Sequence, residues 1–150
     1  MKSVVQRVAH ARVRVEGEIV GAIERGLLVL VGVERGDTSA DARASAQKIA
    51  SMRVFPGDKP MDRSVIDIAG SVLVVSQFTL AGTLKKGRRP GFERAEDPER
   101  AQALYLEVAT LLREQGIPTE TGRFAAHMEV ELLNEGPVTL LVFTEGGVIV

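Results

Sequence analysis

The sequence predicts a single α+β domain, built from several β-strands and two main helices. The first observation is the alternation of apolar and polar residues over Ser3–Val15, which is typical of a half-buried strand. The second is a pair of continuous apolar runs, Gly26–Val33 and Val72–Val75, which suit strands buried on both faces. The third is a change to helical spacing in two segments that begin near Thr38 and Asp97.

The overall composition excludes several classes of function. A formal net charge of −1 argues against a general nucleic-acid binder, so no DNA partner is expected, and any polyanion must be met by a local patch. The chain has no cysteine, and its histidines, His10 and His127, lack the spacing of metal ligands. We therefore expect neither a metal nor another cofactor. No apolar run approaches ~20 residues, which predicts no membrane partner and a cytoplasmic location.

The first half of the chain is predicted to contain three strands and a helix. Glu16–Glu18 supplies a turn, after which Ile19–Ile23 returns as the hairpin partner of the first strand. Gly26–Val33 then forms a central strand. The helix starts with Asp37 or Thr38 as its N-cap and continues to Arg53.

The next strand has an unusual polar end. After a loop over 54–63 and a short strand at Ser64–Ile68, the strand begins at Val72 and is expected to end at Leu80. Buried polar groups without a partner cost about 1–3 kcal/mol each. The polar side chains could pair with neighbouring backbone where the strand leaves the sheet, or they could belong to a site; they are Ser76, Gln77 and Thr79.

A basic loop follows at residues 81–94. It carries five cations against the single acid Glu93, and its glycines and proline disfavour regular structure. Charge runs are usually solvated, but the position directly after the polar strand end favours phosphate binding. The cations are Lys85, Lys86, Arg88, Arg89 and Arg94.

The last third is predicted to hold one structural helix and a hairpin. Asp97 is the N-cap of the helix and Gly116 ends it. A segment from Thr121 to Met128 then leads into a strand, Asn134–Thr139 interrupts the hairpin, and Leu140–Phe143 is its second strand. The remaining residues are expected to form a short tail. Within the segment, Phe124 and Met128 suit core positions, and Arg7 in the first strand suits a surface charge.

The remaining chemistry is positioning rather than nucleophilic attack. The chain lacks a GxSxG elbow and glycine patterns typical of nucleotide-binding loops. A strand end with hydroxyl, amide and backbone donors suits a site that stabilises a developing oxyanion, with the substrate supplying the reactive hydroxyl.

Two longer motifs carry a family resemblance. Ser76-Gln-Phe-Thr-Leu80 and Asn134-Glu-Gly-Pro-Val-Thr139 closely resemble the two signature motifs of D-aminoacyl-tRNA deacylases. The likeness extends over nearly the whole chain. It includes 5–8, 26–32, 64–65, 86–90 and 121–124.

The resemblance implies a β-barrel-like mixed sheet with two helices and a homodimer whose two active sites lie at the interface. It implies hydrolysis of the ester between a D-amino acid, or mischarged glycine, and the 3′ end of tRNA. Gly136-Pro137 would be cis, would reach into the partner's site and would exclude an L side chain. Arg7 would support this Gly-Pro segment.

The resemblance also implies roles for the other motif residues. Ser76, Gln77, Phe78 and Thr79 would line the catalytic pocket, with the N–H groups near Phe78 and Thr79 as oxyanion donors. Thr79 would position the substrate, and the 2′-hydroxyl of the terminal adenosine would assist. The residues expected to bind tRNA or the adenosine are Arg7, Lys85, Lys86, Phe124, Met128 and Asn134.

Some positions depart from the usual family sequence, and two other functions stay open. The departures are Asp62, Ala125, His127 and Glu135, and they bear on fine specificity more than on reaction class. One rival is an editing domain that removes L-amino acids, which the intact Gly136-Pro137 disfavours. The other is a non-enzymatic tRNA-binding or nucleotide-binding module, which would bind tRNA without hydrolysing its ester.

Overall fold

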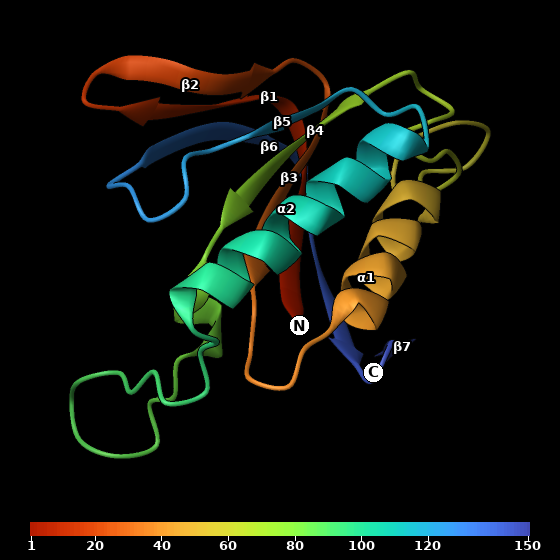
Figure 1. The fold of residues 1–150 in the computed structure, drawn as a ribbon. Coiled ribbons are helices and arrows are strands. Elements are labelled where there is room, and N and C mark those ends of the chain that lie inside the picture. Colours follow the sequence, from red (N-terminus) through yellow and green to blue (C-terminus); the bar gives the residue numbers. More distant parts are fainter.

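The chain folds into a curled, seven-stranded mixed sheet with two helices on one face (Figure 1). The computed structural model describes residues 1–150. The strands are β1 (Lys2–Val15), β2 (Glu18–Ile23), β3 (Gly26–Gly32), β4 (Ser71–Ser76), β5 (Thr119–Thr121), β6 (Glu129–Glu145) and β7 (Val148–Ile149). The helices are α1 (Ser39–Ser51), α2 (Pro98–Glu114) and the short 3₁₀ helix η1 (Phe78–Ala81).

Strand β1 organises the sheet, because three strands pair with it. Its first half lies between β3 and β6, and its second half lies between β2 and β6, all antiparallel. From β3 outward the sheet is parallel, through β4 to β5. The expected hairpin of β1 and β2 and the central place of β3 are therefore confirmed, as is the α+β class with a curled mixed sheet.

The core has two parts, one on each face of the sheet. The larger part lies between the sheet and helices α1 and α2, and includes Leu27, Val74, Tyr105 and Leu112. The smaller part lies on the opposite face of the sheet and is built around Val13 and Leu73. Burial of such side chains supplies most of the driving force for this fold. Neither helix has the length and hydropathy needed to cross a membrane.

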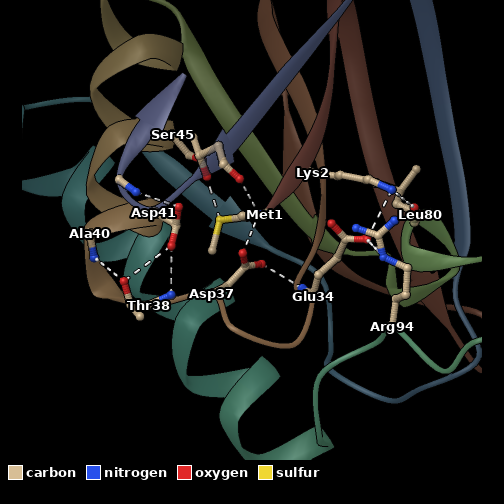
Figure 2. Close-up of polar contacts among 12 residues, drawn as sticks. Met1, Lys2, Glu34, Asp37, Thr38, Ala40, Asp41, Ser45, Leu80 and Arg94 are labelled. Carbon is tan, nitrogen blue, oxygen red and sulfur yellow. Dashed lines mark hydrogen bonds and ion pairs between the residues drawn. The ribbon is translucent and has the colours of Figure 1, made fainter. Parts of the chain in front are cut away.

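Both helices begin where the sequence predicts. Thr38 is the N-cap of α1 and forms a capping box with Asp41. Asp97 is the N-cap residue of α2 with Pro98 in the first turn, but the Asp97 side chain makes no capping hydrogen bond. Figure 2 shows how the start of α1 is tied to β1: the Met1 amino group donates to Asp37 at 2.6 Å.

Two predictions in the middle of the chain are wrong. Ser64–Ile68 is a turn rather than a strand, because Asp67 Oδ2 accepts from the Ser64 N–H and Ser64 Oγ accepts from the Asp67 N–H. The strand predicted to end at Leu80 ends at Ser76. The Gln77 N–H makes the last bond to β3, at Val31 O, and η1 follows.

The predicted C-terminal hairpin around Gly136-Pro137 is also wrong. β6 runs without reversal from Glu129 to Glu145 along β1, with Asn134 opposite Val8 and Thr139 opposite Gln6. Residues 135–138 therefore form a bulge opposite Arg7. The hairpin lies further on, between β6 and β7, where a plain tail is expected. The short strand β5 has no counterpart among the predicted elements.

Candidate active site

A pocket of about 520 Å³ lies where β4 ends, between the start of α2 and the segment that precedes β6. Most of its lining is apolar. The residues that line it are Val31, Val33, Val75, Ser76, Gln77, Phe78, Ala95, Glu96, Pro98, Ala101, Tyr105, Phe124, Ala125, Ala126, His127, Met128 and Val130. Five of the candidate residues are therefore brought together: Ser76, Gln77, Phe78, Phe124 and Met128.

The polar wall of the pocket is formed by the end of β4 and by η1. Gln77 Nε2 donates a hydrogen bond to Thr79 Oγ1, so the Thr79 hydroxyl remains free to donate elsewhere. Thr79 is exposed beside the pocket rather than part of its lining. No turn or loop carbonyl accepts from the N–H of Phe78 or Thr79. Gly32 allows this close packing, since a Cβ there would lie 2.7 Å from the Leu80 Cβ.

The opposite wall of the pocket contains Phe124 and Met128. The sequence allows either a core position or a position in the site for both residues. Phe124 stacks on Tyr105 with 6.0 Å between ring centroids. Met128 covers Gly122, where a Cβ would lie 2.8 Å from its sulfur. Ala125 between them has φ +60°, which an L residue rarely adopts. Phe124 and Met128 are half-buried and face the pocket.

Three ionisable side chains line the pocket, and sequence reasoning missed all of them as site residues. Burial raises the pKa of the Tyr105 phenol, against a hydrogen bond with Thr121 and the charge of Arg113, so the phenol stays neutral. Glu96 Oε1 accepts from the Asp97 N–H at 2.9 Å, and its other carboxylate oxygen pairs with Arg100. His127 is exposed. Helical apolar spacing marks Tyr105 as core, and only the fold places it at the pocket.

Gly136-Pro137 lies outside this pocket. The peptide bond between the two residues is cis. Arg7 is buried, with 7% of its surface exposed, and is not the surface charge that its local sequence suggests. Its Nε donates to Glu135 O at 3.0 Å, and its Nη1 donates to Val54 O at 2.7 Å.

Asn134 holds the other side of the same bulge. Its Oδ1 accepts from the Val138 N–H at 3.1 Å, and its Nδ2 donates to Thr139 Oγ1 at 3.0 Å. Gln6 Nε2 donates to the same Thr139 hydroxyl. The second motif is therefore braced from both ends, by Arg7 and by Asn134.

The basic loop projects from the body of the molecule ahead of α2, as the green loop in Figure 1 shows. Lys85, Lys86, Arg88 and Arg89 are exposed, and none of them takes part in an ion pair. Arg94, at the end of the loop, pairs with Glu34 at 3.3 Å (Figure 2). The free cations are thus presented to solvent, away from the pocket lining. No group of three or more possible metal-ligating side chains occurs in the structure.

Comparison with known proteins places the chain in a family. The model of the family described as D-Tyr-tRNA(Tyr) deacylase matches residues 4–143. A Geobacter sulfurreducens protein named D-aminoacyl-tRNA deacylase is 53% identical over 146 residues, covering 97% of this chain and 96% of the relative. An Anaeromyxobacter dehalogenans protein of the same name is 54% identical, covering 95% and 96%.

Two solved structures have the same fold. One, titled c-Myc DNA Unwinding Element Binding Protein, superposes with a TM-score of 0.91 at 39% identity, covering 97% of this chain and all of the other. A probable eukaryotic D-amino acid tRNA deacylase superposes with a TM-score of 0.77 over 93% of this chain. At 18% identity, it supports the fold alone.

The fold and pocket, together with these matches, define an enzyme of the aminoacyl-ester hydrolase class. The chain belongs to the D-Tyr-tRNA(Tyr) deacylase family, whose curated relatives are named D-aminoacyl-tRNA deacylase. The resemblance of its two motifs to this family is confirmed.

Proposed function

We propose that this protein hydrolyses the ester bond of D-aminoacyl-tRNA and releases the free D-amino acid and tRNA. The observation that carries the proposal is the pocket formed by Ser76, Gln77 and Phe78 opposite Phe124 and Met128. Its volume of about 520 Å³ falls within the range of small-ligand sites. The aminoacyl group lies against the first wall, and the terminal adenosine lies between Phe124 and Met128.

Catalysis proceeds by positioning and by stabilisation of the oxyanion. Water attacks the ester carbonyl, and the N–H groups of Phe78 and Thr79 donate to the oxygen on which negative charge develops. The adjacent 2′-hydroxyl of the adenosine assists the attack, and the ester oxygen leaves with a proton. Thr79 positions the substrate and does not attack it. Its hydroxyl contacts the Gln77 amide and no histidine, lysine or carboxylate. Such a hydroxyl has no base to activate it as a nucleophile.

Chiral selection depends on Gly136 and Pro137 of a second copy of the chain. These residues reach into the pocket of the partner subunit, and their carbonyl groups occupy the space that an L side chain would need. A D side chain points elsewhere and is accepted. Glycine has no side chain to reject, so mischarged glycyl-tRNA is also a substrate.

The homodimer that this mechanism needs has support in the sheet. β6 pairs with β1 along one edge, and residues 129–143 have no strand on the other edge. Exposed apolar side chains lie on this strand and its neighbour, and Leu141 is 64% exposed. Exposed apolar groups on a free strand edge are typical of an interface. The other exposed apolar residues of β6, β7 and the residue after β7 are Leu133, Leu140, Val148, Ile149 and Val150.

The tRNA backbone is bound by the basic loop. Lys85 and Lys86, with Arg88 and Arg89, present unpaired charges to solvent next to the start of α2. Phosphates near the 3′ end of tRNA are the polyanion that such a patch attracts. The pocket itself then needs to read only the terminal aminoacyl-adenosine.

The decisive test of this mechanism compares Thr79→Ala with a changed substrate. D-Tyr-tRNA ending in 2′-deoxyadenosine should be hydrolysed at least ~100-fold more slowly than D-Tyr-tRNA, since it lacks the assisting hydroxyl. Thr79→Ala should retain activity within about tenfold, and Thr79→Ser should match the original protein. Complete loss in Thr79→Ala with normal turnover of the deoxy substrate would make Thr79 the nucleophile. Binding of tRNA without turnover of any ester would favour a non-enzymatic binding module.

A further inference from the structure

Phe78 is an exposed aromatic side chain at a place where catalysis needs rigidity. It follows Gln77, lines the pocket and begins the short helix η1, yet 59% of its surface is exposed. An exposed side chain changes rotamer readily unless a neighbour packs against it. The N–H groups proposed as oxyanion donors belong to this residue and the next. No turn or loop carbonyl accepts from these two N–H groups. Packing of the Phe78 side chain therefore contributes to their placement, beside the backbone hydrogen bonds of Gln77 and Leu80.

The aromatic ring that packs against Phe78 is that of Phe92. The two ring centroids lie 5.0 Å apart and the ring planes meet at 61°, an edge-to-face arrangement. This geometry is favourable because the positive edge of one ring meets the negative face of the other. Phe92 does not line the pocket, and its ring contacts the pocket residue Phe78.

Phe92 is itself fixed at the base of the basic loop. The Thr83 and Gly91 backbones exchange two hydrogen bonds, of 2.8 and 2.9 Å, just before it. The Ala95 N–H donates to Phe92 O at 3.0 Å just after it. Gly82 leaves room for its ring, since a Cβ there would lie 3.0 Å from the Phe92 Cε1.

Arg94, at the end of the loop, is tied directly to a carboxylate on the body of the protein, and Leu80, just before the loop, is tied to the same carboxylate through Lys2. Lys2 and Arg94 converge on Glu34, at 3.2 and 3.3 Å (Figure 2). Lys2 Nζ also reaches Leu80 O in η1, at 3.4 Å. Phe92 is thus part of a braced loop base, and Phe78 rests on it.

We propose that Phe92 is a positioning residue for ester hydrolysis: it holds the Phe78 ring, and with it the Phe78 and Thr79 amides, in the reactive arrangement. The inference rests on the proposed function and adds a residue outside the pocket to its machinery. A residue of this kind affects turnover more than binding, since small displacements of catalytic groups lower the rate of the chemical step.

The test compares Phe92→Leu with Phe92→Tyr, which keeps the ring. Steady-state kinetics are measured with D-Tyr-tRNA and with the 3′-D-tyrosyl ester of adenosine, which lacks the phosphates that the loop would bind. Phe92→Leu should lower kcat about tenfold or more on both substrates and change KM by less than about twofold. Phe92→Tyr should keep kcat within about twofold. Leu84→Ala is the matched control, because Leu84 is in the same loop and 77% exposed; it should change neither parameter.

A second readout does not depend on turnover. The NMR resonances of the Phe78 ring should shift in Phe92→Leu and should stay in place in Leu84→Ala, because only the first change removes the neighbouring ring current. An unchanged Phe78 spectrum, or a Phe92→Leu variant with normal kcat, would overturn the inference. If Phe92→Leu does not fold, Phe92→Met takes its place with the same expected results. Absence of turnover in the unsubstituted protein would instead refute the proposed function.

Discussion

The Arg7 guanidinium contacts both the carbonyl and the carboxylate of Glu135, the residue directly before Gly136-Pro137. Arg7 Nε lies 3.0 Å from the Glu135 main-chain oxygen and 2.7 Å from Oε2, and Nη1 donates to Val54 O. A buried arginine so placed fixes the start of the bulge opposite β1, because its donors are held in a rigid fork.

Arg7→Lys should therefore lower the selectivity of the enzyme. A lysine ammonium group is a single point charge and cannot reach Val54 O and Glu135 O with the same geometry. The ratio of D-Tyr-tRNA to L-Tyr-tRNA hydrolysis should fall at least ~10-fold, because the bulge loses its fixed position. Glu135→Gln is the control: its carboxylate is half exposed, so its ion pair contributes little and the ratio should change less than about threefold. An unchanged ratio in Arg7→Lys would remove Arg7 from this role.

Gly136→Ala should impair both selectivity and stability. Gly136 has φ +132°, and an added Cβ would lie 2.9 Å from Arg7 Nη2 and from the Val138 Cγ2. Backbone strain of this kind costs about 1–3 kcal/mol. Thermal unfolding should report the lower stability, and hydrolysis of L-Tyr-tRNA relative to D-Tyr-tRNA should rise. Equal stability and equal selectivity would show that this position tolerates a side chain.

Mixing two variants with different defects tests whether each site is shared between subunits. Gln77→Ala damages the pocket, and Pro137→Ala damages the segment proposed to enter the partner's pocket. Gln77→Ala alone should be inactive, and Pro137→Ala alone should hydrolyse both D-Tyr-tRNA and L-Tyr-tRNA. A mixed dimer contains one site in which both parts are intact. Mixed dimers isolated through two affinity tags should therefore hydrolyse D-Tyr-tRNA at about half the rate of the original dimer and reject L-Tyr-tRNA, because their one working pocket faces an intact Pro137. Hydrolysis of L-Tyr-tRNA by these mixed dimers would place both parts in one chain.

The basic loop should affect binding and not the chemical step. A variant with Lys85→Gln and Lys86→Gln should raise KM for D-Tyr-tRNA several-fold at low salt and leave kcat unchanged, because charges that meet phosphates contribute mainly to binding. The dependence of KM on salt concentration should become less steep by about the number of charges removed. Lys48→Gln, on α1, is the control. Equal tRNA binding by the double variant and the control would contradict a role of the basic loop in binding.

Asp41 should make the fold sensitive to acid. Burial disfavours its charged form, but hydrogen bonds from Gly147 and Thr38 and the nearby Met1 ammonium together hold its pKa below the ordinary value of 3.8. The folded state then binds this proton less readily than the unfolded state, so the stabilisation is fully present above about pH 4. It is lost as the pH falls through the lowered pKa of the folded protein. Asp41→Asn should unfold at lower urea concentration than the original protein at pH 7, and the two should converge towards pH 2.

Sequence patterns predicted the strands and helices whose periods are undisturbed. Alternation over β1 and apolar runs in β3 and β4 depend on burial alone, and so do the faces of α1 and α2. The patterns failed where specific contacts decide. Ser64–Ile68 forms a turn and not a strand, because Ser64 and Asp67 hydrogen-bond to each other. β6 continues past Gly136-Pro137 because it pairs with β1 on both sides of this segment, although Gly-Pro alone predicts a turn.

The two sequence motifs predict the candidate site, but local patterns of polarity and spacing do not. Polar residues at the end of β4 and the cluster of cations were visible in the sequence. By contrast, Tyr105 has the spacing of a core residue, and Arg7 is predicted at the surface because it is charged. Only tertiary contacts place Tyr105 at the pocket and Arg7 against the bulge. Likewise, the sequence around Phe92 does not indicate a role for this residue at the site. Contacts between residues far apart in sequence are what local patterns lack.

Selection against L side chains can be measured as hydrolysis of D-Tyr-tRNA and of L-Tyr-tRNA by the purified protein, at equal concentrations and neutral pH. We expect rapid release of D-tyrosine, whereas the L ester should decay no faster than it does in buffer. Comparable rates for the two esters, or faster release of L-tyrosine, would contradict selection against L side chains by Gly136-Pro137.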